Sequence, residues 1–209
     1  METERLHHDL EMFLRNGGSL SLTWNRNHEL LRLPFEIHPG VIVPAGEYDF
    51  SEFPVSAASD PSARIFGDVA ISFGQLYEGT LRAYDFIVGF RTGPKFVTEL
   101  SYVNTGVDAV WGRFNTNLGR LRASYSFTPY HFIQALIQYN SALREISSNI
   151  RFNWIYKPLS DLFLVYNERR STTGKVIERA LIAKFTYEIR RRHTSELQAR
   201  RHLVCRLLL

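Results

Sequence analysis

Polar and apolar residues alternate one by one along most of this sequence, and this period of two constrains the fold more than any other feature. In segment 120–127, apolar residues at the odd positions alternate with arginine and serine at the even positions. The same alternation returns in segments 133–140, 150–157 and 181–189. Successive side chains of a β-strand point to opposite faces of a sheet. Each segment is therefore expected to be a strand with one apolar and one polar face.

The amino-terminal half shows the same alternation in shorter runs, which residues typical of turns separate. Asn16-Gly17-Gly18 tolerates the positive φ angles of a tight hairpin. Short turns are also expected at Thr92-Gly93-Pro94, Thr128-Pro129 and Lys157-Pro158-Leu159-Ser160, and longer polar links at 104–111, 141–148 and 169–177. With no convincing helix before residue 190, the sequence predicts an all-β fold. We expect an antiparallel meander of about 10–12 strands that forms a β-barrel or part of one.

The net charge of +4 is concentrated at the carboxy terminus. Six arginines and one glutamate in residues 190–209 give +5, which leaves −1 for the rest of the chain. A nucleic-acid-binding protein carries its basic residues on the folded surface, so no nucleic-acid partner is expected. We divide the chain into a β-barrel domain, 1–190, and a basic tail, 191–209. Two interpretations of the tail stay open: a short helix lying on a membrane surface, or an altered, irregular terminus.

The residue types that carry catalysis or bind metals do not form a recognisable set. Cys205 is the only cysteine, which excludes an internal disulfide and a thiolate zinc cage. His7 and His8 are adjacent, so in a strand they point to opposite faces. Thr173-Gly174-Lys175 lacks the first glycine of a phosphate-binding loop and is typical of a hairpin turn. We expect no enzyme, no cofactor and no metal site.

The alternation alone leaves open whether the apolar faces meet lipid or form the core of a soluble sandwich. Three features favour lipid. The polar faces are rich in Gln, Asn, Ser and Thr, aromatic residues gather near strand ends, and several strands reach the ~9–11 residues of a tilted membrane crossing. The residues expected to face the lumen are Arg122, Gln134, Gln138, Asn140, Arg151, Asn153 and Lys184. A hydrogen-bonded network that fills the barrel is the favoured interpretation, and a substrate passage is the alternative.

Five segments carry a resemblance to a known family: 34–37 (PFEI), 44–50 (PAGEYDF), 133–141 (IQALIQYNS), 151–156 (RFNWIY) and 158–168 (PLSDLFLVYNE). They resemble a bacterial outer-membrane β-barrel domain of unknown function. In that family the barrel typically follows a signal peptide and a module similar to the family-nine carbohydrate-binding domain. The resemblance implies that this chain is the carboxy-terminal portion of a larger protein.

Two function hypotheses follow. The first is a segment of a bacterial outer-membrane β-barrel that acts as a scaffold or pore, surrounded by membrane lipid and inserted by the barrel-assembly machinery. The resemblance adds carbohydrate binding or uptake, with a saccharide as ligand. The alternative is a soluble all-β binding module whose core contains Tyr125, Phe152 and Trp154. The first predicts insolubility without detergent, whereas the second predicts a monodisperse protein in plain buffer.

Overall fold

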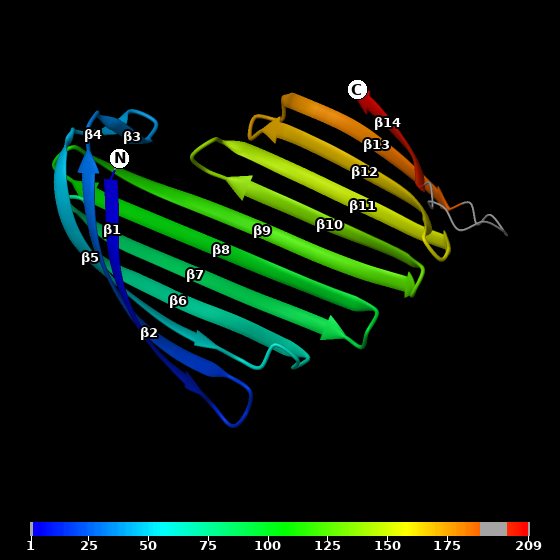
Figure 1. The fold of residues 1–209 in the computed structure, drawn as a ribbon, viewed down its shortest axis with the longest axis horizontal. Coiled ribbons are helices and arrows are strands. Elements are labelled where there is room, and N and C mark those ends of the chain that lie inside the picture. Colours follow the sequence, from blue (N-terminus) through cyan, green and yellow to red (C-terminus); the bar gives the residue numbers. More distant parts are fainter. Residues whose placement is uncertain (1, 189–199, 209) are drawn as a thin grey trace, which may run out of the picture. The chain divides into compact units, whose positions relative to one another are not determined.

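The computed structural model describes residues 2–188 and 200–208, and β-strands make up most of them (Figure 1). Twelve strands form one sheet in the order β1-β2-β5-β6-β7-β8-β9-β10-β11-β12-β13-β14, and β3 and β4 form a separate pair. Among the described residues no pairing joins β1 to β14, so the order is that of an open sheet. The strands are β1 Glu2–Phe13, β2 Ser19–Leu31, β3 Phe35–His38, β4 Val41–Val43, β5 Gly46–Ala58, β6 Ile65–Leu76, β7 Gly79–Thr92, β8 Phe96–Ala109, β9 Gly112–Thr128, β10 His131–Asn140, β11 Glu145–Lys157, β12 Ser160–Ser171, β13 Val176–Glu188 and β14 Arg200–Leu208.

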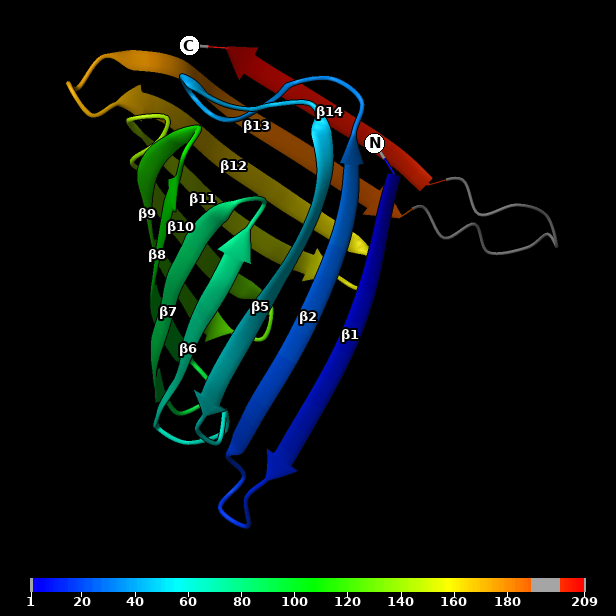
Figure 2. The same cartoon turned by 90° about the vertical axis from the view of Figure 1, so that its left-hand side faces the viewer.

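The predicted fold class, an all-β antiparallel meander, is confirmed. Strands that follow one another in the chain lie next to one another, apart from the β3–β4 pair between β2 and β5. Figure 2 shows β1, β2 and β5 side by side, and their registers are antiparallel. No helix in the part of the chain that the structure describes is long and apolar enough to cross a membrane.

The carboxy-terminal tail corrects one prediction. Residues 200–208 form β14, which pairs with β13 from Ala180↔Leu208 to Glu188↔Arg200, so a helix is wrong for this part. The physical reason is that the edge of β13 presents unpaired N–H and C=O groups, which a neighbouring strand satisfies and a helix does not. The remainder of the predicted tail, 191–199, lies outside the described residues, and a domain boundary at residue 190 stays a prediction.

The longer polar links predicted at 104–111, 141–148 and 169–177 are also wrong for half of their length or more. β8 continues to Ala109, β11 begins at Glu145 and β12 continues to Ser171. Glu145 and Ser171 are themselves cross-strand partners. Ladder hydrogen bonds join backbone groups, so polar side chains do not stop a strand whose neighbour continues.

Three of the predicted tight turns are confirmed by their backbone angles. Gly17, Gly93 and Gly174 have φ angles of 83°, 56° and 89°, in the region that glycine adopts without a steric penalty. The first turn is closed by a 2.8 Å hydrogen bond from the Leu14 N–H to the Gly18 carbonyl.

The chain divides into two compact units, which we describe separately. The described residues of unit 1 are 2–90, 99–119 and 140–143, and those of unit 2 are 91–98, 120–139, 144–188 and 200–208. Unit 1 thus holds β1 to β6 and most of β7, and unit 2 holds β11 to β14.

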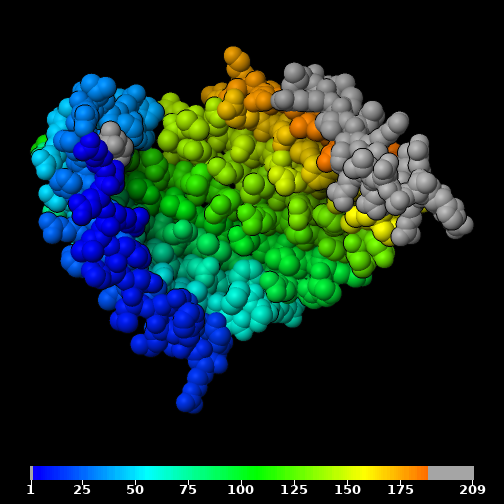
Figure 3. Space-filling model, viewed as in Figure 1, coloured from blue at the N-terminus to red at the C-terminus, as the bar shows by residue number. Residues whose placement is uncertain are grey.

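A short excursion between β2 and β5 adds Val43 to the main hydrophobic core of unit 1. The β3–β4 hairpin turns at Gly40, whose φ is 78°, and it lies at one end of β1 in the space-filling view (Figure 3). Val43 is fully buried against a cluster of large side chains, and Trp111 packs on its margin. The other buried members of this cluster are Leu31, Tyr48, Phe50 and Tyr77.

Candidate functional site: the two faces of the sheet

Cross-strand registers place the apolar residues of unit 1 in continuous rows on one face, here called the apolar face. Residues directly opposite each other in antiparallel strands share a face. One row crosses five strands, and a second row lies beside it. The rows are Leu10, Leu22, Val55, Ile71, Tyr84 and Met12, Leu20, Ala57, Val69, Phe86.

The apolar face is the more exposed face of unit 1. All ten residues of the two rows are exposed, and the nine larger ones range from 37% at Tyr84 to 66% at Leu10. The row between them on the opposite, polar face is Glu11, Ser21, Ser56, Ala70 and Asp85, and all but Glu11 are partly buried. A water-soluble domain normally buries its apolar residues, so this distribution is inverted.

A chain of polar contacts crosses the polar face of unit 1. Asn25 is only 2% exposed, whereas its neighbour Trp24, on the apolar face, is 38% exposed. The Asn25 amide donates to Glu52 Oε1 at 2.9 Å, and its Oδ1 lies 2.6 Å from His7 Nδ1. Arg5 lies 3.8 Å from the same Glu52 oxygen. The most shielded polar group in this chain, Asn25, is therefore paired on both sides, whereas Asp85 Oδ1 on the same face has no hydrogen-bond partner among the described residues.

The expectation that His7 and His8 point to opposite faces is confirmed. His7 contacts Asn25 on the polar face, and the His8 ring stacks on Trp24 with ring centroids 5.4 Å apart. Within the residues described, no group of three or more His, Cys, Asp or Glu side chains is placed to hold a metal ion.

Unit 2 also has an exposed apolar face. The rows Trp154, Leu162, Phe185 and Ile150, Tyr166, Leu181 share its apolar face, where Trp154 and Phe185 are 41% and 43% exposed. The opposite face holds Val165 and Ala180, which are 7% and 2% exposed. It also carries polar residues, so it is mixed in character. Trp154 is thus an exposed residue of the described chain and not the centre of a core.

The structure brings three of the seven predicted lumen residues together. Arg122, Gln134 and Arg151 line one shallow pocket of about 250 Å³ in unit 2. The Arg151 Nε donates to Asn149 Oδ1 at 2.8 Å, within the same pocket.

The other four lie elsewhere. Asn153 and Lys184 share a face, each opposite Phe163 in the register. Asn153 Oδ1 is buried without a hydrogen-bond partner in the described part of the chain. Gln138 is half-buried. Asn140 belongs to unit 1, where its Oδ1 accepts from the Ala142 N–H at 2.9 Å, so it shapes a turn.

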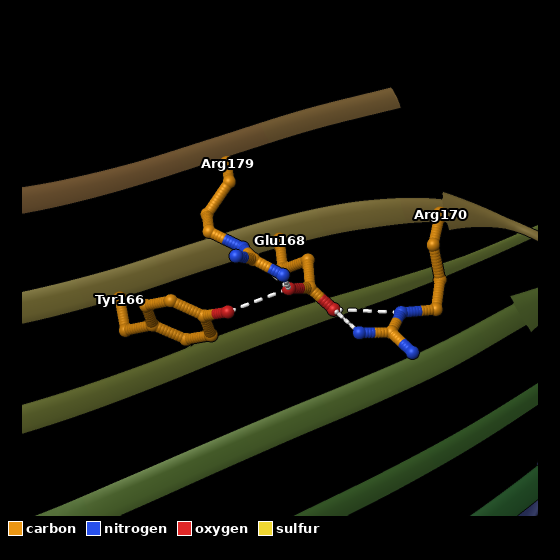
Figure 4. A network of polar contacts seen from close by, with 4 residues as sticks. All are labelled: Tyr166, Glu168, Arg170 and Arg179. Carbon is orange, nitrogen blue, oxygen red and sulfur yellow. Dashed lines mark hydrogen bonds and ion pairs between the residues drawn. The ribbon is translucent and has the colours of Figure 1, made fainter. Parts of the chain in front are cut away.

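A cluster of charged residues that the sequence analysis missed lies on the apolar face of unit 2, beside the β12–β13 turn (Figure 4). Glu168 accepts from Arg170 Nε at 2.7 Å, from Arg179 Nε at 2.8 Å and from the Tyr166 hydroxyl at 2.6 Å. The Glu168 side chain is 8% exposed, whereas Arg170 and Arg179 are 42% and 35% exposed. We call these four residues the Glu168 cluster.

The sequence did contain a signal for the Glu168 cluster. Tyr166, Glu168 and Arg170 are two residues apart and so share a face of β12. The predicted turn at Thr173-Gly174-Lys175 folds β13 back on β12, where Arg179 becomes the direct partner of Glu168. The signal was lost because 169–177 was interpreted as an irregular link.

The opposite face carries the reverse arrangement of charge. Arg169 lies 3.7 Å from Glu145 and 3.5 Å from Glu178. Two guanidinium groups against one carboxylate give the Glu168 cluster a net charge of +1, while two carboxylates against Arg169 give −1. At this end of unit 2, the apolar face is therefore the positive one.

Comparisons of the chain with protein-family models, curated proteins and solved structures found no match.

Proposed function

We propose that this chain is a segment of a bacterial outer-membrane β-barrel that acts as a membrane scaffold or pore. The observation that carries the proposal is the inverted exposure of the sheet faces. In unit 1, ten residues in two apolar rows are exposed, and all but one residue of the polar row between them is partly buried. Lipid is the solvent in which an exposed apolar face is stable.

The dimensions of the apolar face support contact with a bilayer. On β6, alternate positions from Ile65 to Phe73 lie on the apolar face. Eight steps of about 3.4 Å give ~27 Å along the strand. At the ~40° tilt usual for membrane barrels this becomes ~20 Å along the membrane normal, close to the ~25 Å apolar band of such proteins.

The edges of the apolar face also suit a membrane interface. In unit 1, Tyr84 closes the apolar run of β7, and the next residue on that face is Arg82. In unit 2, Tyr166 lies in the same way between Leu164 and Glu168 on β12. Aromatic residues followed by charged ones are characteristic of the girdle of a membrane protein.

The polar faces would line the lumen. The contacts among His7, Asn25 and Glu52 favour a network that fills space, whereas the pocket lined by Arg122 and Arg151 leaves room for a small polar ligand. A saccharide is the proposed ligand because of the resemblance to a family that carries a carbohydrate-binding module. Insertion would require the barrel-assembly machinery, and the outer edges of β1 and β14 would need partners, since lipid leaves no strand edge unpaired.

A soluble all-β binding module is the second candidate. It is favoured by the buried cluster beneath the β3–β4 hairpin, where Val43 is 0% and Leu31 4% exposed. In this case another protein surface would cover the apolar face.

The test is expression of the chain behind a signal peptide, fractionation of the cells, and gel electrophoresis of the outer-membrane fraction with and without boiling. The proposal expects an outer-membrane band that migrates faster before boiling than after it. Monodisperse protein in detergent-free buffer, with no shift on boiling, supports the soluble module and contradicts the proposal.

A further inference from the structure

We propose that the Glu168 cluster binds the phosphate head group of an anionic membrane lipid whose acyl chains lie on the apolar face of unit 2. This inference rests on the proposed membrane function. Four observations support it.

The first observation is the position of the cluster. Along β12 the apolar face presents Leu162, Leu164 and Tyr166 and then changes abruptly to Glu168 and Arg170. Along β13 the same face presents Phe185, Ala183 and Leu181 and then Arg179. A lipid lying on this face would have its chains on the leucine rows and its head group at the arginines.

The second observation is the donor geometry. Arg170 and Arg179 both converge on Glu168, from its own strand and from the neighbouring strand. An arginine has five N–H donors, and the contacts with Glu168 use Nε and Nη2 of each guanidinium. Both side chains remain 42% and 35% exposed, so an acceptor with several oxygens, such as phosphate, can reach their other donors.

The third observation is the role of Glu168. Its carboxylate is 8% exposed and is held by both arginines and by the Tyr166 hydroxyl. It fixes the two guanidinium groups side by side before any ligand arrives. The remaining net charge of +1 attracts an anion, whereas the Arg169 group on the opposite face has a net charge of −1.

The fourth observation is the restraint of the β12–β13 hairpin. The Ser171 N–H donates to the Lys175 carbonyl at 2.8 Å, and the Thr172 N–H donates to the Arg144 carbonyl at 2.9 Å. The hairpin is thus held by one hydrogen bond within its own turn and by another to the β10–β11 turn. Arg170 and Arg179 therefore lie on two strands whose connecting turn is fixed by hydrogen bonds, which favours a preformed site.

The experiment measures the fraction of the full chain that floats with lipid vesicles. One set contains only a short-chain phosphatidylcholine, and the other contains phosphatidylglycerol as one lipid in five. The ratio of the two bound fractions reports the preference for an anionic head group. A third arm adds millimolar inorganic phosphate to the second set.

Arg170→Gln and Arg179→Gln should each reduce that preference about fivefold, the size expected for one arginine near an anionic surface. The matched control is Arg169→Gln, at the neighbouring position on the opposite face. It loses two ion pairs where each of the other arginine variants loses one, and it should keep the preference. Glu168→Gln should raise the preference, because it changes the net charge of the cluster from +1 to +2 while the glutamine carbonyl can still accept hydrogen bonds from the two arginines. A purely structural cluster would lower stability in all these variants and leave the preference unchanged, which would overturn the inference.

The arms separate the two proposals. Failure of the wild-type chain to bind and enter phosphatidylcholine vesicles contradicts the membrane function itself, and with it the inference. Insertion without any preference for phosphatidylglycerol contradicts the inference alone. Loss of the preference in millimolar inorganic phosphate would show that the arginines bind a free anion, and this would overturn the assignment to lipid.

Discussion

Replacing Val69 by arginine tests which solvent the apolar face meets. Val69 lies in the row that joins Ala57 to Phe86, and it is 42% exposed. It is the third of five apolar-face positions on β6, with Ile65 and Phe73 at the ends. Val69 is four residues from either end of this run, a distance of ~13 Å along the strand. At the usual strand tilt this places it ~10 Å deep in the membrane, measured from either edge of the apolar face.

The depth of Val69 fixes the size of the effect. An arginine on the lipid face destabilises a membrane barrel by about 2–4 kcal/mol at the midplane and by about 0–1 kcal/mol near the interface. Because Val69 is near the middle of its run, Val69→Arg should lower the free energy of unfolding by about 3 kcal/mol in lipid. In water, an exposed position of this kind would change stability by only about 0.5 kcal/mol.

Ala70→Arg is the matched control, since Ala70 is the next residue and points to the polar face. Its cross-strand partner is Asp85, whose Oδ1 has no hydrogen-bond partner among the residues described. The new guanidinium would meet a carboxylate, so the loss should be under about 1 kcal/mol. Reversible urea unfolding in thin phosphatidylcholine vesicles measures both variants. Equal losses, or a harmless Val69→Arg, would refute the assignment of the faces.

Three further predictions concern unit 1. Burial, with the Glu29 carboxylate beside it, raises the pKa of Tyr77 to about 12. The stabilisation from the protonated hydroxyl should be present below about pH 10 and lost as pH rises toward 12. Tyr77→Phe should remove both the late ultraviolet titration and this pH dependence of stability. Gly89→Ala would place a Cβ 2.1 Å from the Phe66 ring, so it should lower the unfolding free energy by about 1–3 kcal/mol. Adding Phe66→Ala should recover part of that loss, and a double-mutant cycle would measure how much. Val43→Ala empties a fully buried site and should destabilise the β3–β4 hairpin by about 2 kcal/mol, with faster proteolysis there than in wild type.

The alternation was enough to predict most of the strands and their faces, because a sheet whose two faces have different surroundings imposes a period of two on the sequence. Trp154 and Asn153 are adjacent residues that the pattern assigned to opposite faces, and the register places them so. The tight turns were predictable for a similar reason, since Gly17 and Gly174 need positive φ angles that few other residues tolerate.

The remaining features depend on pairing, which local composition does not encode. Glu145 lies in a polar stretch, yet it belongs to a strand because Ser171 is its partner. The β3–β4 hairpin was missed because its core joins Val43 to Tyr77 and Trp111, far apart in the sequence. The Glu168 cluster was missed because Arg179 meets Glu168 only through the hairpin register.

The most direct test of the central claim is a spin-label scan of β6 in lipid vesicles. Each residue from 65 to 73 except Gly67, where an added Cβ would lie 2.6 Å from the Ile87 carbonyl oxygen, would be replaced in turn by a labelled cysteine in a chain carrying Cys205→Ser. We expect collisions with oxygen, which concentrates in lipid, to peak at the odd positions, and collisions with a water-soluble nickel reagent to peak at the even ones. Odd positions that respond mainly to the nickel reagent, or to neither reagent, would contradict contact between the apolar face and lipid.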